Sequence, residues 1–231
     1  MVRSVVILFC LLCGLRAMPQ DSGRALHFVP LLNATPLQLD VPLLLADGTP
    51  LIITQLRFYV SQIRFFDKDH VAFIDSVSHL VDASAPNSVL IKADFPKTIH
   101  VDSISFLLGI DSLTNVSGAF GGDLDPTTGM YWTWNSGYIN WKLEGTCANC
   151  NTTKNEFQFH LGGYMAPYFN AQQIGLKVKG EEVITIEVDV SKFLAQAKLG
   201  ERCTVMSPGK DAVALAKLAA SVFSIPHRSE E

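Results

Sequence analysis

Thr54–Phe66, with the sequence TQLRFYVSQIRFF, is the stretch that decides the fold. Its apolar and polar residues alternate, as they do in a strand with one buried face. One face carries Leu56, Phe58 and Val60. The alternation changes phase at Ile63 and Phe65, which predicts one long strand with a β-bulge at Gln62.

Further strands are predicted downstream of this stretch. Val101–Ile110, VDSISFLLGI, has the same apolar alternation. Near the end of the chain, Ile174–Val178 and Val183–Val190 flank the polar residues 179–182, KGEE. Because the second run, VITIEVDV, alternates cleanly, the two runs predict a β-hairpin.

Helical patterns are confined to the C-terminal part of the chain. Ser191 precedes Lys192–Leu199 and Gly200 follows it, which predicts a short helix with an N-cap and a terminal glycine. The pair Ser207-Pro208 opens a second predicted helix, because proline fits the first helical turn.

Together these patterns predict a mainly β protein. We expect an antiparallel two-sheet β-sandwich with one or two short C-terminal helices. No repeat or low-complexity linker divides the chain, so residues 26–225 are predicted to form a single domain. With 48% hydrophobic residues among 231, the chain can build a substantial core.

The start of the chain has the pattern of an export signal. Arg3 precedes an apolar run, Val5–Leu15, of about 11 residues, which is too short to span a bilayer. We expect residues 1–18 to be a signal peptide and the mature protein to be periplasmic or secreted, monomeric and without a transmembrane segment. Only 17% of residues are charged and the net charge is -4, so nucleic acid is not an expected partner.

Three cysteines follow the signal: Cys147, Cys150 and Cys203. An odd number leaves one thiol unpaired in an oxidising compartment. Cys147 and Cys150 lie in the motif CANC, which predicts a local disulfide and leaves Cys203 as the free thiol. A redox pair or half of a zinc site is the alternative, but no second such pair supplies the remaining zinc ligands.

The densest aromatic segment contains all three tryptophans. Residues 123–145, DLDPTTGMYWTWNSGYINWKLEG, include Trp132, Trp134 and Trp141. On a strand, Trp132 and Trp134 would share one face; they either line a site or anchor the core. Downstream, His160 lies in FQFHLGG, on the face opposite Phe159. A histidine in this setting either ligates a metal or forms a buried hydrogen bond.

These motifs resemble a known family. LDPTTGMYWTWNSGYINWKLEG, followed by FQFHLGG, is similar to the core of the MbnP-like family of exported bacterial proteins. The family includes copper-binding members of methane-oxidising bacteria. The segments LRFYVSQIRF at 56–65, LVDAS at 80–84 and VMSPG at 205–209 resemble further family segments in the same order. The resemblance spans roughly residues 26–223.

The resemblance implies an exported protein that binds or buffers Cu(I). It also implies a partner, a di-haem enzyme related to bacterial cytochrome c peroxidases, which oxidises a tryptophan to kynurenine. His160 matches a family histidine, whereas Pro30 and Cys203 stand where the family often has histidine. The implied copper site consists of His160, Cys203 as a thiolate, Trp132, Trp134 and the weak donor Met206.

A second function stays open on the same scaffold. The chain could be a non-metal extracellular binding or interaction module, which the two absent family histidines favour. The intact aromatic motif favours copper. An enzyme is not expected, because the sequence shows no acid/base or nucleophile constellation.

Overall fold

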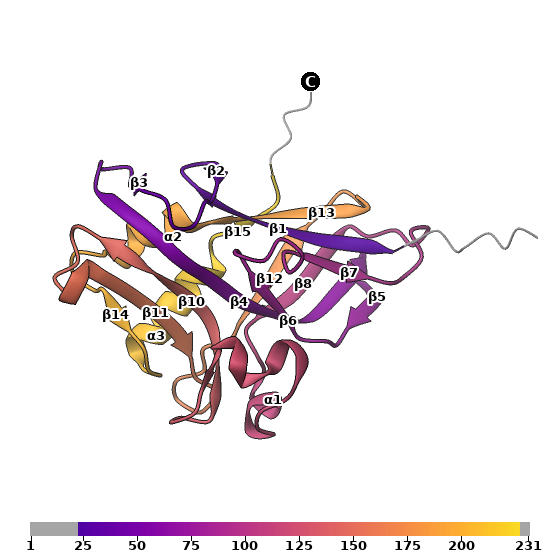
Figure 1. Ribbon diagram of the computed structural model, residues 1–231. Coiled ribbons are helices and arrows are strands. Elements are labelled where there is room, and N and C mark those ends of the chain that lie inside the picture. Colours follow the sequence, from indigo (N-terminus) through magenta and orange to yellow (C-terminus); the bar gives the residue numbers. More distant parts are fainter. Residues whose placement is uncertain (1–22, 227–231) are drawn as a thin grey trace, which may run out of the picture.

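Two β-sheets form the framework of the computed structural model, which describes residues 23–226 (Figure 1). The predicted signal peptide, residues 1–18, lies outside the described residues. Sheet A has the strand order β15-β13-β1-β2, with β7 paired to β1. Its strands are β1 (Arg24–Leu32), β2 (Thr35–Pro36), β7 (Leu90–Ala93), β13 (Val183–Asp189) and β15 (Phe223–Ser224).

Sheet B is the larger sheet, with the order β12-β8-β4-β10-β11-β14 and four short strands beside this path. The strands on the path are β4 (Pro50–Asp67), β8 (Ser103–Leu108), β10 (Gly137–Cys147), β11 (Glu156–Gly162), β12 (Gln172–Lys177) and β14 (Thr204–Val205). The additional strands are β3 (Leu43–Leu44), β5 (His70–Asp75), β6 (His79–Asp82) and β9 (Tyr131–Trp132).

Strand β4 contains the stretch that the sequence singled out, and it runs through the middle of sheet B (Figure 1). The predicted bulge is confirmed: Gln62 has a φ of 50°, and the register with β8 shifts between Ser61 and Arg64. The bulge keeps the apolar residues on both of its sides directed into the core, namely Leu56, Phe58, Val60, Ile63 and Phe65.

The predicted two-sheet, sandwich-like architecture is confirmed, but the sheets are mixed instead of purely antiparallel. Strand β1 pairs in parallel with β13, and β11 pairs in parallel with β14. Aromatic side chains from both sheets fill the space between them; Phe28 of sheet A contacts Phe58 of sheet B with ring centroids 5.7 Å apart. Such edge-to-face contacts add to the free energy of simple burial.

The predicted C-terminal hairpin is wrong. Both strands exist, but β12 pairs with β8 in sheet B and β13 pairs with β1 in sheet A. The connection between them therefore crosses from one sheet to the other. The buried guanidinium of Arg24 fixes this crossover, because it donates hydrogen bonds to the carbonyl oxygens of Gly180 and Glu181, and also to those of Lys97 and Ile99.

Both predicted C-terminal helices are present, as α2 (Val190–Ala197) and α3 (Lys210–Ala220). Asp189, not Ser191, caps α2 by accepting from the amide of Lys192, and Gly209 precedes α3. The buried face of α3 carries Ala212, Leu215, Ala216 and Ala219. Within residues 23–226, no helix is long and apolar enough to cross a bilayer.

A second, smaller hydrophobic cluster covers the outer face of sheet B. It joins Tyr59 of β4 to the long loop that holds α1 (Ser112–Val116) and the 3-10 helices η1 (Gly122–Leu124) and η2 (Pro126–Thr128). A third 3-10 helix, η3 (Thr153–Asn155), precedes β11. The other members of the cluster are Ile110, Met130, Trp132, Tyr138 and Ile139. The aromatic motif is thus a layer folded onto the side of sheet B that faces away from sheet A (Figure 1).

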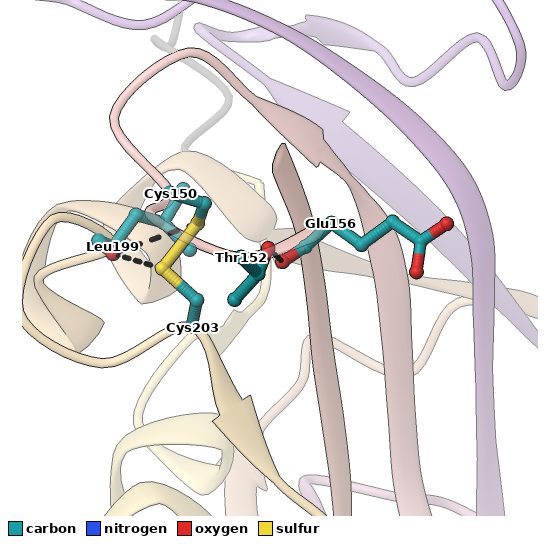
Figure 2. Close-up of a disulfide and its surroundings, with 5 residues drawn as sticks. All are labelled: Cys150, Thr152, Glu156, Leu199 and Cys203. Atoms are coloured by element: carbon teal, nitrogen blue, oxygen red, sulfur yellow. Dashed lines mark hydrogen bonds between the residues drawn. A yellow bond between two sulfur atoms is a disulfide. The ribbon is translucent and has the colours of Figure 1, made fainter. Parts of the chain in front are cut away.

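The predicted disulfide between Cys147 and Cys150 is wrong. Cys150 forms a disulfide with Cys203, with their Cα atoms 5.8 Å apart (Figure 2). Among residues 23–226, Cys147 is the free cysteine, and it is buried. Cys147 ends β10, and its side chain packs in the main core. Cys150 follows the turn, and Cys203 lies beside it because the carbonyl oxygen of Cys203 accepts from the amide of Gln158 on the next strand.

Tryptic peptide mapping without reduction tests this pairing. Cleavage after Lys142, Lys154, Arg202 and Lys210 leaves Cys147 and Cys150 together in peptide 143–154 and Cys203 in peptide 203–210. We expect the two peptides to be cross-linked; a closed disulfide inside 143–154 would contradict the structure.

The bridge closes a loop of 53 residues. Its reduction should therefore lower the free energy of unfolding by roughly 2–4 kcal/mol, whereas Cys147→Ala should not alter this redox dependence.

Candidate functional site

A row of polar side chains crosses the outer face of sheet B in direct register. Asp82 of β6 pairs with Arg57 of β4, Arg57 pairs with Lys142 of β10, and Lys142 pairs with His160 of β11. The neighbours of these residues along each strand, such as Phe58 and Phe159, belong to the main core. Because side chains alternate along a strand, the whole row points away from the core, towards the aromatic loop.

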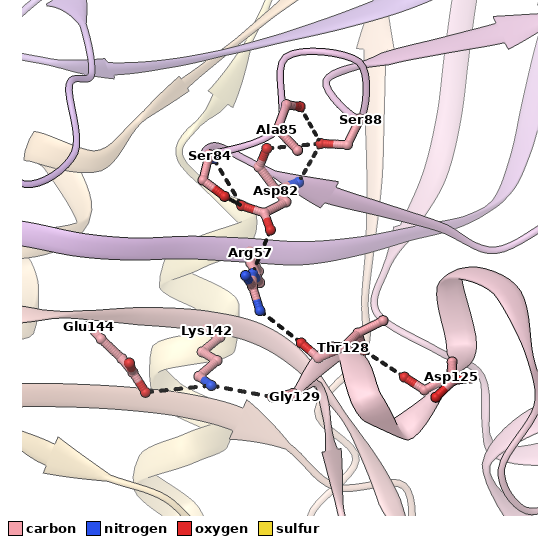
Figure 3. Close-up of polar contacts among 10 residues, drawn as sticks. All are labelled: Arg57, Asp82, Ser84, Ala85, Ser88, Asp125, Thr128, Gly129, Lys142 and Glu144. Carbon is pink, nitrogen blue, oxygen red and sulfur yellow. Dashed lines mark hydrogen bonds and ion pairs between the residues drawn. The ribbon is translucent and has the colours of Figure 1, made fainter.

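The two basic residues of the row hold the aromatic loop in place (Figure 3). Arg57 contacts the Asp82 carboxylate at 2.7 Å and donates to the carbonyl oxygen of Thr128, also at 2.7 Å. Lys142 donates to the carbonyl oxygen of Gly129 at 3.3 Å. These carbonyls end η2, where backbone acceptors lack partners within the helix, so the cations satisfy them. The loop segment that leads directly into Trp132 is therefore anchored to the sheet.

His160 is buried and its ring is oriented by a carboxylate. Its Nε2 lies 2.5 Å from Oε1 of Glu144, and the Lys142 ammonium lies 3.6 Å from the same oxygen (Figure 3 shows the Lys142–Glu144 pair). The hydrogen bond from His160, followed by the charge of Lys142, holds the pKa of Glu144 below its usual value despite partial burial. With Nε2 engaged, Nδ1 is the ring nitrogen left for another ligand.

Trp132 lies on the same side of the sheet as His160. A Cβ built on Gly162 would lie 2.8 Å from the Trp132 ring, so this ring packs directly on Gly162. Gly162 and His160 are two residues apart on β11 and face the same way. The sequence therefore singled out two residues, Trp132 and His160, that the fold brings to one region.

The spacing of Trp132 and Trp134 predicted that they would share one face of a strand, but they do not lie on a common strand. Strand β9 ends at Trp132, and Trp134 belongs to the turn that follows. Trp132 is 5% exposed and Trp134 is 64% exposed, while their ring centroids are 5.5 Å apart. Trp132 is thus a core anchor that borders the row, and Trp134 presents an indole to solvent beside it. Trp141 lies on the opposite side, in the main core.

Cys203 does not join His160 as a free thiolate, because it is bonded to Cys150. Met206, the predicted weak donor, follows β14 and is partly exposed. Val205, the last residue of β14, pairs with Phe159 in parallel, so Met206 follows β14 at the level where His160 follows Phe159. The arrangement offers an imidazole with a carboxylate behind it, a nearby indole and a thioether.

Sequence reasoning missed Glu144, Arg57 and Lys142. A signal for two of them was present: in Lys142-Leu143-Glu144, charged residues alternate with a core residue, which is typical of a strand whose outer face is functional or covered. The pairing with His160 depends on the register of β10 against β11, which the sequence pattern did not specify.

The pair of Glu144 and His160 should make stability depend on pH. Because the pKa of Glu144 is lowered in the folded protein, its stabilising effect is complete above its unfolded value of 4.5 and is lost as the pH falls through the folded value. We expect Glu144→Gln to melt at a lower temperature than wild type at pH 7, with a smaller difference at about pH 3, below the unfolded value of 4.5. Thermal melts at both pH values measure this; Glu187→Gln, on sheet A, is the control. An equal difference at both pH values would rule out the charge effect.

Comparisons with known proteins agree with the motifs on this face. The MbnP family model matches residues 22–207 of the chain. The solved structure of MbnP from Methylosinus trichosporium is similar, with a TM-score of 0.53 and 13% sequence identity over 81% of each chain. At this identity the likeness demonstrates a shared fold. No curated protein sequence matches the chain significantly. The family match covers most of the chain, including the aromatic loop and His160, and the chain therefore belongs to the MbnP family.

Proposed function

We propose that the protein is exported and binds or buffers Cu(I) on the outer face of sheet B, with His160 as its imidazole ligand. Membership of the MbnP family and the apolar, signal-like N-terminal run support this proposal. In it, the protein acts as a monomer in the periplasm or outside the cell and is not itself an enzyme. Copper is the cargo, and the protein supplies the site that holds it.

The pairing of His160 with Glu144 is the observation that carries the proposal. Histidines that bind metals usually donate their second ring N–H to a carboxylate, which fixes the ring and raises the basicity of the ligating nitrogen. Glu144 takes this position at Nε2 of His160. The buried ring would then offer Nδ1 to a metal, with Trp132 packed on the same strand at Gly162.

The available donors suit a soft ion in low coordination. Imidazole nitrogen and thioether sulfur both bind Cu(I), and copper binds tightly enough that few ligands suffice. We therefore revise the ligand set that the family resemblance implied: Met206 takes the role of the sulfur ligand, because Cys203 is held in a disulfide. The carbonyl oxygens near the row are already bonded to Arg57 and Lys142.

The proposed partner is a di-haem enzyme related to bacterial cytochrome c peroxidases, with a peroxide as oxidant. Two equivalents of hydrogen peroxide would cleave the indole C2–C3 bond and add two oxygen atoms, with release of two waters, to give N-formylkynurenine. Hydrolysis of the formyl group by water would then release formate and leave kynurenine. Trp134 would be the first indole that a docked partner meets, since it is exposed and its ring is 5.5 Å from that of Trp132. The kynurenine amine or carbonyl would add a donor to the site.

Exposed apolar side chains favour a second candidate function, a non-metal interaction module. These side chains come from α1, from the loops that contain Phe120 and Tyr164, and from the turn after β9. Hydrogen bonds tie the two loops to α1 and β10: Ser112 donates to the carbonyl oxygen of Tyr164, and the Tyr138 hydroxyl accepts from the amide of Phe120. The exposed side chains are Leu113, Val116, Phe120, Trp134, Met165 and Phe169. Exposed apolar side chains that gather into one patch mark interaction sites.

A Cu(I) titration separates the two functions. The background should be Cys147→Ala, so that the remaining thiol cannot bind copper, with ascorbate as the reductant so that the disulfide survives. We expect one Cu(I) per chain in competition with a chromophoric chelator. His160→Asn should remove this binding, and Glu144→Gln should weaken it about tenfold or more, as loss of a carboxylate behind a ligating histidine does.

His79→Asn is the matched control for this experiment. His79 pairs with Asp75 through Nε2 at 2.8 Å, which resembles the pair of His160 and Glu144, but it lies on β6 opposite the core residue Val60 and so outside the row. Its replacement should leave Cu(I) binding unchanged. Equal, weak binding by wild type, His160→Asn and His79→Asn would end the copper proposal and leave the interaction module.

Protein isolated from its native cell envelope tests the modification. We expect the intact mass to exceed that of the unmodified mature chain by the small increment of kynurenine formation, located by peptide mapping at Trp132 or Trp134. Protein made without the haem partner should lack the increment and, if the kynurenine is a donor, bind Cu(I) more weakly. An unmodified native chain would remove tryptophan oxidation from the proposal while leaving copper binding by His160 testable.

A further inference from the structure

A second group of metal-ligating side chains lies at the far end of β4, roughly 30 Å along the strand from Arg57. It consists of Asp67, His100 and Asp102. Asp67 is the last residue of β4, and the other two residues precede β8. Phe66 pairs with Ser103, and the amide of Asp102 donates to the carbonyl oxygen of Phe66. The pairing of β4 with β8 therefore brings the three side chains to one point.

The ligand atoms are already close to the spacing that one metal ion requires. Oδ1 of Asp67 lies 3.1 Å from Nδ1 of His100, and ligand atoms of all three residues lie within 4.8 Å of one another. Ligands about 2.0–2.2 Å from a tetrahedral ion are about 3.4 Å apart. Asp67 and His100 are already close to this separation, and the ligand atom of Asp102 lies within 4.8 Å of both.

The position of the Asp102 carboxylate is fixed before any metal binds. One oxygen accepts from the amide of Lys68 at 2.7 Å, and the other accepts from the hydroxyl of Ser103 at 2.8 Å. Each oxygen keeps a lone pair for another ligand. Hydrogen bonds of this kind orient metal-binding carboxylates.

A fourth donor lies next to the group. His70 begins β5 and stands directly opposite Asp67 in the hairpin between β4 and β5. Directly opposite residues have Cβ atoms about 5 Å apart on the same face, so the His70 imidazole can reach the same ion by rotation. Two lysines lie near the group. Lys68 is on the hairpin turn, and Lys177 of β12 pairs with Ser103 of β8, so that its charge acts on Asp102.

We propose that Asp67, His100 and Asp102 form a site for a divalent transition-metal ion of the Zn²⁺ or Cu²⁺ class, with His70 or water completing the coordination. Carboxylates and imidazole suit divalent ions of intermediate hardness, whereas Cu(I) prefers sulfur and imidazole alone. The protein would then hold two metals of different chemical type, one beside β11 and one at the end of β4. This site is independent of the copper proposal, because no residue is shared.

Isothermal titration of the full mature chain with Zn²⁺, a redox-inactive probe, tests this site. Cys147→Ala is again the background, to remove the thiol. We expect the Cys147→Ala protein, in which Asp67, His100 and Asp102 are unchanged, to bind one Zn²⁺ per chain. His100→Asn and Asp102→Asn should each weaken binding by more than about tenfold, and His70→Asn should weaken it less. Thermal melts should rise on addition of Zn²⁺ for wild type and not for His100→Asn.

Two controls separate this site from others. His79→Asn removes a histidine that pairs with a single aspartate, Asp75, and should leave Zn²⁺ affinity unchanged. His160→Asn should also leave it unchanged, while it removes Cu(I) binding if the proposed function is correct. Unaltered Zn²⁺ affinity in His100→Asn, or no Zn²⁺ binding by the background protein, would overturn the inference without bearing on the copper site.

Discussion

The register of β4 is the constraint on which the rest of the structure depends. This strand of 18 residues pairs with β3, β5, β6, β8 and β10. A one-residue slip would turn a strand's core residues towards solvent, so the bulge at Gln62 is required for Ile63 and Phe65 to face the same core as Leu56. Before the bulge, the outer face of β4 positions Arg57 beneath the aromatic loop. After it, the strand delivers Asp67 to the pairing with β8.

The parts of the fold that could be predicted are those determined by local alternation and by short helix signals. The phase change at Ile63 revealed the bulge, and the two C-terminal helices followed from their boundaries. The prediction of a hairpin between β12 and β13 was wrong because a four-residue polar connection has the same sequence pattern whether its two strands pair with each other or join different sheets. What separates them is Arg24, which is more than 150 residues away from Gly180 and binds its carbonyl oxygen. Long-range hydrogen bonds of this kind leave no local pattern.

In the candidate site, too, some residues could be predicted from the sequence and others could not. His160 and Trp132 could be found because their motifs are unusual, but the residues that position them could not. Glu144 meets His160 across a strand pair, and Arg57 and Lys142 act by binding backbone carbonyls that have no side-chain signature. Each contact follows from the registers of β4, β10 and β11 together. A row of charges in consecutive register becomes visible only when three pairings are known.

The disulfide changes the role of the segment that precedes α3. As a thiolate, Cys203 would have supplied a strong soft ligand; bonded to Cys150, it instead ties the start of β14 to the turn after β10. Because Val205 then pairs with Phe159, the chain leaves β14 at Met206, one register step from His160. A thioether cannot be oxidised to a disulfide and keeps its affinity for Cu(I) without losing a proton. In the proposed copper site, Met206 would therefore remain a soft donor in an oxidising compartment, where a second free thiol would be lost to disulfide exchange.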